Sequence, residues 1–288
     1  IEYYVNIFYS LKIIQMKTIL VPTDFSTAAD NALSVAKLIA RKTNATIHLA
    51  HFYSIPVADY SYPDVSMPAE ILEQTRKNVI LQINDLETQL KADGYNVCST
   101  VDMGLVFDEV VTLADKLAVY LIVMGTTGAS GIVNKVMGSN AAHVMQRTER
   151  PMILIPEHSK VKDIQKIVYL DELEQDDTAV LNNLLAFADD LAIHHIRILN
   201  VSTGFFYKPI DEEVVTLIRN NFGDSKVKIE TVEGIDVKEG VDHYLKEHPI
   251  DLVVMSTRKR TFLERIFSKS DTHEMALYTK VPLLVYHK

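Results

Sequence analysis

Two patterns of hydrophobic and polar positions take turns along this chain. Short apolar runs rich in Val, Ile and Leu predict strands over 17–24, 45–52, 95–101, 119–124 and 151–156. Between them, apolar residues recur at helical spacings, which predicts helices that each bury one face. Strands that alternate with helices are typical of βα units and a largely parallel sheet, in which ligands bind at the carboxyl ends of the strands.

Cap and turn residues mark the ends of the predicted helices. Ser26 is a typical N-cap residue for a helix that should run to about Arg41, and Gly94 should end the long helix after the second strand. Gly104 and Gly138 precede the two helices that follow. The pattern therefore indicates a complete α/β domain within the first part of the chain.

The same pattern begins again after residue 165. IVYLDE resembles ILVPTD, and HHIRILNV resembles ATIHLAHF. Met124 then pairs with Met255 and Pro151 with Pro282, with the same offset through loop, helix and final strand. A constant offset of this kind indicates an internal repeat, so the chain is interpreted as a tandem duplication.

The repeat predicts two domains, over 16–158 and 164–288, joined near 157–165. The segment 1–15 stands apart, because it is apolar but shorter than the ~20 residues that span a bilayer. It has neither the basic region nor the cleavage site of a secretory signal. We interpret it as a leader or extra segment before a start at Met16; the alternative is an added edge strand or a dimer contact.

Composition narrows the classes of function. The 288 residues are 48% hydrophobic and carry a net charge of −9, which argues against an open surface for nucleic acid or for an anionic membrane. No segment is predicted to cross a membrane. The single Cys98 excludes an intrachain disulfide and a cysteine zinc site, and we expect it to be a small buried apolar residue. A reducing, cytoplasmic location fits this composition.

The most informative motif is GTTGASGIVNKVMGS, which runs from Gly125 through Gly128 and Gly138 to Ser139. It follows a predicted strand and precedes a predicted helix, an arrangement that gathers backbone N–H groups around a phosphate. Ser139 is placed where it could serve as the N-cap of that helix. The alternative is that the glycines only form turns.

Together with VPTDFS at the end of the first strand, this motif resembles the universal stress protein family. The match to the family's G-x2-G-x9-G-(S/T) pattern is complete in the first repeat, and the resemblance extends from Met16 to Lys288. It implies two doubly wound, mostly parallel, five-stranded Rossmann-like α/β domains with strand order 3-2-1-4-5. It also implies an intramolecular pseudo-dimer through PMILIP and PLLVYH; a homodimer of chains is a further possibility.

The resemblance further implies an adenine nucleotide, ATP or ADP, possibly with Mg²⁺. Asp24 would accept a hydrogen bond from the ribose or base, and Phe52 would line the adenine pocket. The residues implied around the ligand are Pro22, Thr23, Asp24, Phe52, Met124, Gly125, Thr127, Gly128, Gly138, Ser139 and Asn140. Two alternatives stay open: Asp24 could cap the first helix beside Ser26, and Phe52 could belong to the core.

The second repeat departs from the motif. It has Ser256, Lys259 and Lys269 in place of the three glycines and keeps only Ser270. Asp171 and Glu172 both lie near the position of Asp24, and neither matches it cleanly. We therefore expect one nucleotide site per chain, in the first repeat. The basic stretch 257–269 could be a solvated loop, bind an anion, or fill the vacated pocket.

The resulting functional prediction is a cytoplasmic stress or signalling protein whose nucleotide state biases binding to an unknown protein partner. No nucleophile elbow, HExxH sequence or Walker A motif is present, so no catalytic residue is assigned. His48 and His51 should point to opposite faces of a strand, so no metal held by the protein alone is expected. The alternatives are a nucleotide-independent scaffold and a weak ATPase.

Overall fold

The computed structural model describes residues 16–54, 69–127, 138–171, 173, 178–203, 211–223, 225–257 and 281–287. Several expectations concern residues outside this part of the chain. They are those for the segment 1–15, Gly128, Glu172 and the stretch 258–280, which includes Lys259, Lys269 and Ser270.

The first half contains every strand and helix that its pattern predicts. In chain order these are β1 Thr18–Pro22, α2 Thr27–Thr43, β2 Thr46–Tyr53, α3 Ala69–Ala92, β3 Val97–Met103, α4 Val106–Lys116, β4 Leu121–Gly125, α5 Ser139–Arg147 and β5 Met152–Ile155. Ser26 is the N-cap of α2, as predicted, and its side chain accepts a hydrogen bond from the Ala29 N–H. The helix runs slightly past Arg41, to a C-cap at Asn44 in the left-handed region.

The second half repeats this order. Its elements are β6 Ile167–Leu170, α6 Thr178–Asp190, β7 Ile196–Thr203, α7 Glu212–Phe222, β8 Val227–Gly234, α8 Val237–Glu247, β9 Leu252–Thr257 and β10 Leu283–His287. The α/β class that the hydrophobic pattern predicts is confirmed.

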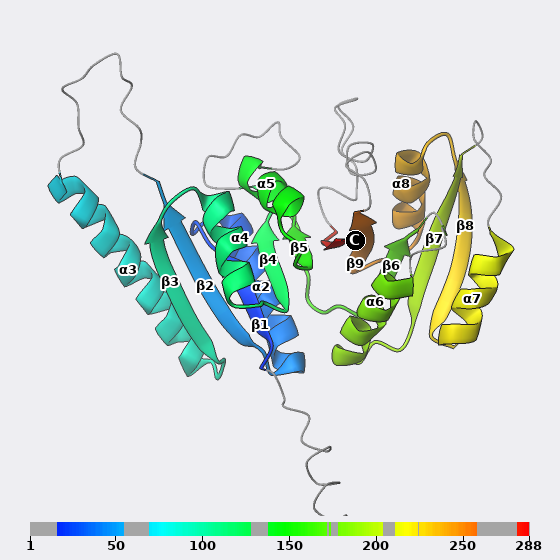
Figure 1. Cartoon of the computed structure of the whole chain (residues 1–288), viewed down its shortest axis with the longest axis horizontal. Coiled ribbons are helices and arrows are strands. Elements are labelled where there is room, and N and C mark those ends of the chain that lie inside the picture. The colour runs from blue at the N-terminus through cyan, green and yellow to red at the C-terminus, as the bar shows by residue number, and fades with distance from the viewer. Residues whose placement is uncertain are drawn as a thin grey trace, which may run out of the picture.

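The strands form one sheet of 10 strands in the order β3-β2-β1-β4-β5-β10-β9-β6-β7-β8. The strands of each half are parallel to one another and follow the predicted order 3-2-1-4-5. The two halves meet where β5 pairs with β10 in antiparallel register, with Ile153 opposite Leu284, near the centre of Figure 1. Pairing of the halves through their last strands is therefore confirmed, and it leaves neither of these strands as an exposed edge.

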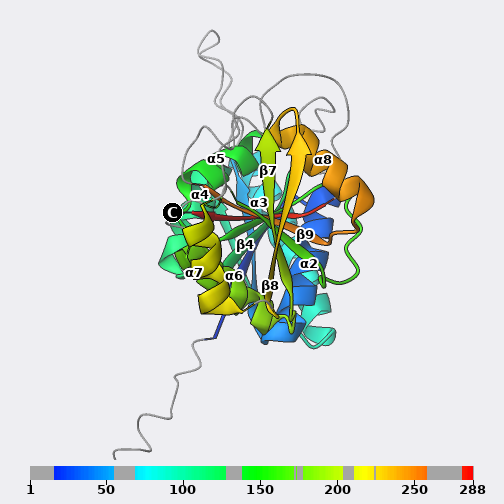
Figure 2. The ribbon, with the colours of Figure 1, turned by 90° about the vertical axis from the view of Figure 1, so that its right-hand side faces the viewer.

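Helices cover both faces of this sheet. Successive strand residues point to opposite faces, so Ile19 and Val21 face α2 and α3, while Leu20 faces α4 and α5. The core on the α2 face continues through Ile153 and Leu284 to α6 and α7 of the second half. Seen along the sheet, the strands of the two halves are turned relative to one another, as sheet twist requires (Figure 2).

Three further observations concern the described residues. None of their helices combines the length and apolar character needed to cross a bilayer. They contain no group of three or more His, Cys, Asp or Glu side chains placed to hold a metal ion. Cys98 is only partly buried, contrary to expectation, because it lies on the edge strand β3.

Candidate functional site

A hollow opens at the carboxyl ends of β1 and β4, where the strand order reverses. Its empty volume is about 640 Å³, which includes the mouth open to solvent. The carboxyl ends of the strands, where the strand order reverses, are where doubly wound sheets bind ligands. Every residue that the sequence implies for the site lines this hollow, except Gly128, which lies outside the described residues.

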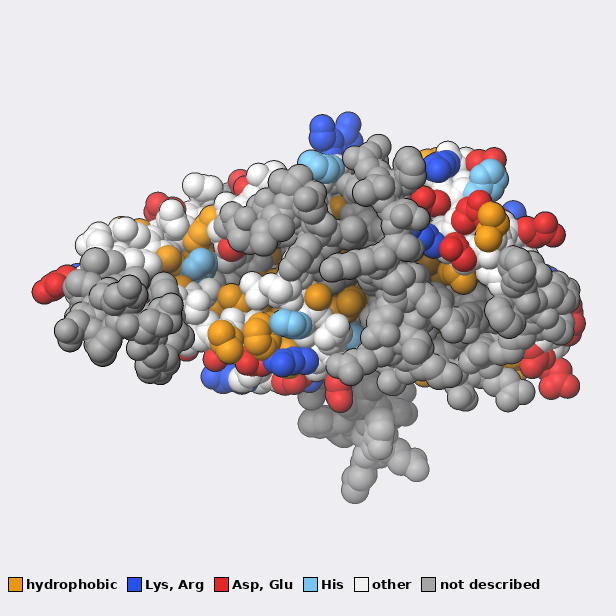
Figure 3. Space-filling view, turned by 90° about the horizontal axis from the view of Figure 1, so that it is seen from above, with side chains coloured by type: hydrophobic (Ala, Val, Ile, Leu, Met, Phe, Trp, Pro, Cys, Tyr) orange, Lys and Arg blue, Asp and Glu red, His pale blue; other side chains and the backbone are white. Residues whose placement is uncertain are grey.

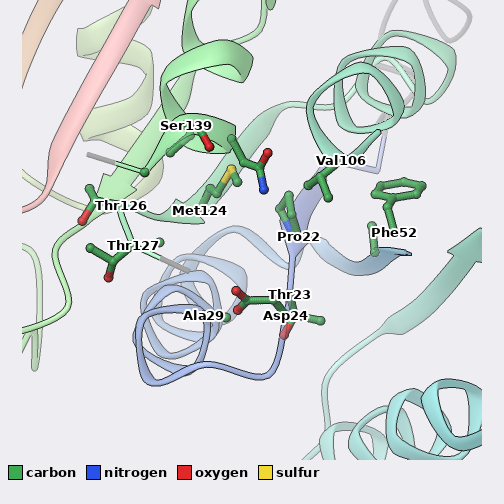
Figure 4. A pocket seen from close by; sticks show the side chains of 15 residues that line it. Pro22, Thr23, Asp24, Ala29, Phe52, Val106, Met124, Thr126, Thr127 and Ser139 are labelled. Atoms are coloured by element: carbon green, nitrogen blue, oxygen red, sulfur yellow. The ribbon is translucent and has the colours of Figure 1, made fainter. Parts of the chain in front are cut away.

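One end of the hollow is apolar. Phe52 from β2, Val106 from α4 and Pro22 from β1 lie toward this end in Figure 4, with Met124 closer to the middle. Phe52 is only 7% exposed and also belongs to the core cluster beneath α4. Its two interpretations are therefore compatible, because one face of a ring can pack in the core while its edge lines a cavity.

Val106 is a lining residue that the sequence interpretation missed, as are Ala29, Ala50, Thr126 and Ala141. Val106 is the first residue of α4, directly after the turn at Gly104. The predicted turn therefore contained the signal, because a helix that starts there must begin beside the strand ends.

The opposite end is polar and is formed by Thr126, Thr127 and the start of α5 (Figure 4). The Gly138 N–H donates a hydrogen bond to the Thr126 carbonyl oxygen at 2.5 Å, which fixes the start of α5 against the end of β4. Ser139 is not the N-cap, contrary to expectation. Gly138 has the extended backbone of the cap, and Ser139 is the first helical residue, exposed at the hollow.

The N-terminus of α5 differs from those of α2, α4, α7 and α8. No side chain caps it, and no acidic residue lies in its first turn. By contrast, Ser26, Asp211 and Asp236 cap α2, α7 and α8, and α4 has two acidic residues in its first turn. The first N–H groups of a helix have no partner within the helix and carry partial positive charge. Those of α5 are therefore placed to bind an anion.

A tight turn follows β1 and places Asp24. The Thr23 hydroxyl accepts a hydrogen bond from the Phe25 N–H (3.1 Å), and an Asp24 carboxylate oxygen accepts one from the Ser26 N–H (3.1 Å). His51 Nδ1 donates to the Thr23 carbonyl oxygen (2.8 Å). Phe25 adopts a φ of 60°, so the turn depends on these hydrogen bonds for an otherwise unfavourable backbone.

Asp24 does not itself cap α2, because Ser26 is the N-cap and the bond from the Ser26 N–H to Asp24 closes the turn before the helix. The carboxylate is exposed and lines the hollow. Together with partial burial, which is the larger cause, its negative charge raises the pKa of Asp30. A carboxylate in this position can accept hydrogen bonds from a neutral hydroxyl or amine of a ligand.

Gly125 is required for a structural reason. A Cβ at this position would lie 2.8 Å from the Ala28 carbonyl carbon and 2.9 Å from its Cβ. The first glycine of the motif therefore lets the start of α2 pack directly on the end of β4. Since α2 forms one wall of the hollow through Ala29, Gly125 shapes the site through this packing.

The second half repeats the turn with different side chains. An Asp171 carboxylate oxygen accepts a hydrogen bond from the Leu173 N–H (2.8 Å), and Leu173 has a φ of 57°. Asn200 donates to the Asp171 carbonyl oxygen (3.1 Å), as His51 does to that of Thr23. Asp171 is therefore the counterpart of Thr23, which leaves Glu172 as the counterpart of Asp24 in chain order.

The counterpart of Gly125 in the second half is Ser256. Its hydroxyl accepts a hydrogen bond from the hydroxyl of the fully buried Tyr169, at 3.4 Å. The helix α6 begins eight residues after β6 ends, whereas α2 begins five residues after β1 ends. The later start of α6 is consistent with a side chain at position 256.

The surface around the mouth is apolar in part. Met103 and Leu105, in the connection from β3 to α4, are 52% and 56% exposed. From above, hydrophobic side chains are visible over the first half, and acidic and basic ones predominate toward the far end of the second (Figure 3).

His48 and Cys98 form a separate polar contact on β2 and β3. The Cys98 Sγ lies 3.1 Å from His48 Nδ1, and His48 Nε2 lies 2.8 Å from the Thr100 hydroxyl. Burial raises the pKa of the Cys98 thiol and lowers the pKa of His48. These shifts favour a neutral pair, which is a structural contact and does not line the hollow.

Comparison with known proteins agrees with this architecture. The model of the universal stress protein family matches residues 16–156 and 171–287. Universal stress protein MJ0531 of Methanocaldococcus jannaschii is 30% identical over 149 residues, which cover 50% of this chain and 84% of that protein.

Solved structures show the same fold over both halves. A universal stress protein from Archaeoglobus fulgidus superposes with a TM-score of 0.69 at 13% identity, covering 95% of this chain and 99% of that one. A putative universal stress protein from Pseudomonas aeruginosa has a TM-score of 0.62 at 16% identity and covers 96% of this chain and 94% of its own.

Proposed function

The chain belongs to the universal stress protein family, and on that premise we propose that its first half binds an adenine nucleotide, ATP or ADP. The observation that carries the proposal is the uncapped N-terminus of α5 at one end of a hollow whose other end is apolar. The N-terminus of α5 can bind a polyanion, and the apolar end can accommodate a planar base.

The proposed ligand lies along the hollow. Adenine would contact Phe52, Val106 and Pro22, with Met124 and Gly125 beneath the nucleotide. The ribose or base would donate a hydrogen bond to Asp24. The phosphates would be bound by Thr127, Gly138, Ser139 and Asn140, together with Gly128. Mg²⁺ would be held mainly by the phosphates, since Asp24 is the one carboxylate among the described lining residues.

We propose binding rather than turnover as the activity. Asp24 is the one acidic or basic side chain among the described lining residues, and it accepts a hydrogen bond from the Ser26 N–H. At the other end no described lining residue can act as a general base, and the one carboxylate that reaches it, Glu157 from outside the lining, accepts a hydrogen bond from the Thr127 hydroxyl. The nucleotide would instead change the affinity for a protein partner, in the cytoplasm. A nucleotide-independent scaffold and a weak ATPase are the competing functions that experiments must separate.

A single added charge tests the site. Ser139→Glu places a carboxylate in the first turn of α5, where it favours the helix and repels phosphate. Its matched control is Gln146→Glu, which adds the same charge near the other end of α5, at an exposed position. ADP and adenosine binding are measured by calorimetry, and folding by thermal denaturation.

Under the proposal, S139E weakens ADP binding at least about tenfold, leaves adenosine binding within about twofold and does not lower the Tm. Q146E should bind ADP and adenosine as the wild type does, with a Tm equal to or slightly below that of the wild type. ADP binding by S139E with wild-type affinity would contradict the phosphate site. A wild-type chain that binds neither ligand would favour the scaffold, and phosphate release in a single-turnover assay would favour the ATPase.

A further inference from the structure

An acidic side chain from the connection between the halves reaches the polar end of the hollow. The Thr127 hydroxyl, which lines the hollow, donates a hydrogen bond to a carboxylate oxygen of Glu157 at 3.2 Å. Glu157 follows β5 and is exposed. Sequence interpretation gave no role to this residue, because it lies 30 positions from Thr127 and outside any motif.

The backbone of Glu157 is held in place from two sides. The Asn31 side chain of α2 donates to the Glu157 carbonyl oxygen at 2.6 Å. The Ser159 N–H donates to the Pro156 carbonyl oxygen at 3.0 Å, and Ser159 is only 4% exposed. These contacts fix the backbone at the start of the connection, from which the Glu157 side chain reaches Thr127.

The charges around the hollow make the effect of the Glu157 carboxylate on anion binding important. The described lining residues include one acidic side chain, Asp24, and no Lys or Arg. Positive potential at the polar end therefore comes from backbone N–H groups, those of the start of α5 being the nearest to Thr126 through the Gly138 hydrogen bond. A second carboxylate beside Thr127 therefore opposes the binding of an anionic group there.

From this geometry we propose that Glu157 sets the charge selectivity of the hollow and disfavours ligands with negative charge at the Thr127 end. The inference rests on the proposed function. The carboxylate acts in two ways: it repels phosphate oxygens, and it engages the one proton that the Thr127 hydroxyl can donate. Each phosphate added to adenosine then contributes less binding affinity than it would without Glu157.

The test compares Glu157→Gln with the wild type. Glutamine keeps the size of the side chain and an oxygen that can accept the Thr127 hydrogen bond, so mainly the charge changes. Glu149→Gln, an exposed carboxylate on the connection from α5 to β5, is the matched control. Calorimetric titrations with adenosine and ADP are run in EDTA at low ionic strength, so that no divalent cation offsets the charge.

We expect E157Q to bind ADP about five- to tenfold more tightly than the wild type and adenosine within about twofold. The gain should shrink in ~0.5 M salt, because exposed charges are screened. E149Q should show no comparable gain.

The outcomes separate this inference from the proposed function. Equal or weaker ADP binding by E157Q, an equal gain for adenosine, or the same gain in E149Q would overturn the role of Glu157 while leaving the nucleotide site intact. If neither the wild type nor E157Q binds adenosine or ADP, the proposed function itself fails.

Discussion

The two halves build the same turn after their first strand and surround it with different side chains. In the first half, Thr23 holds the turn and Asp24 faces the hollow. In the second half, Asp171 stabilises the equivalent turn. Leu173, two positions later, has a left-handed backbone, as Phe25 does in the first half. The backbone and its hydrogen bonds are therefore what the fold needs, and the side chains facing outward from the turn are free to differ.

The difference is sharpest where the first helix meets the fourth strand. Gly125 leaves no room for a Cβ, because the Ala28 backbone lies against it. The counterpart Ser256 has a side chain that instead meets the Tyr169 hydroxyl. Gly125, which the motif suggests as a ligand contact, is thus also required for helix packing. In the second half its replacement by Ser256 accompanies a later start of α6.

Exchanging these two residues should give the largest effect. Gly125→Ser forces a side chain into the Ala28 backbone, so we expect a loss of about 2–4 kcal/mol in the free energy of unfolding. Ser256→Gly loses one hydrogen bond and some backbone rigidity, so we expect about 1 kcal/mol. Urea denaturation of both variants checks the asymmetry. Equal losses would mean that the halves pack alike at this position.

A smaller effect is expected at Phe52, whose counterpart by strand register is Val201. Phe52→Val removes part of a buried ring, which should cost about 1–2 kcal/mol of stability and weaken adenosine binding several-fold. Stability and affinity are measured on the same variant. A loss of stability with unchanged adenosine affinity would assign Phe52 to the core alone.

The His51 side chain donates a hydrogen bond to the Thr23 carbonyl oxygen, and the Asn200 side chain donates one to the Asp171 carbonyl oxygen. His51→Asn supplies the side chain that the second half uses, so stability and ADP affinity should stay within about 0.5 kcal/mol and twofold of the wild type. His51→Ala leaves the Thr23 carbonyl without this donor and should cost about 1 kcal/mol. If H51N is as damaging as H51A, the imidazole has a role beyond this hydrogen bond.

The smallest expected effect is the contribution of His48 to the pH dependence of folding stability. Burial lowers the pKa of His48, whereas its counterpart Arg197 has its pKa raised by a hydrogen bond with Tyr244 and stays charged. Below about pH 6.5 the unfolded chain binds a proton that folded His48 resists, so stability should fall as the pH falls from 7 to 5. The slope per buried histidine is at most about 1.4 kcal/mol per pH unit. His48→Gln should reduce it, and an unchanged slope would assign the effect to other groups.

The sequence allowed the fold to be predicted almost completely, because periodicity and a constant offset define strands, helices and the duplication. The cap at Ser26 followed from the residue types at the predicted helix start, and the pairing of the last strands was implied by the family resemblance. Ser139 was misassigned as a cap because its neighbour Gly138 can take the same extended backbone. Val106 and Glu157 were missed because contacts between distant segments, and not local patterns, bring them to the hollow.

The stoichiometry of ADP binding to the full-length chain measures the difference between the halves most directly. Calorimetric titration of the wild type should give one ADP per chain, and S139E should weaken that binding at least about tenfold. Two ADP molecules per chain, or one that persists unchanged in S139E, would contradict a single nucleotide site in the first half.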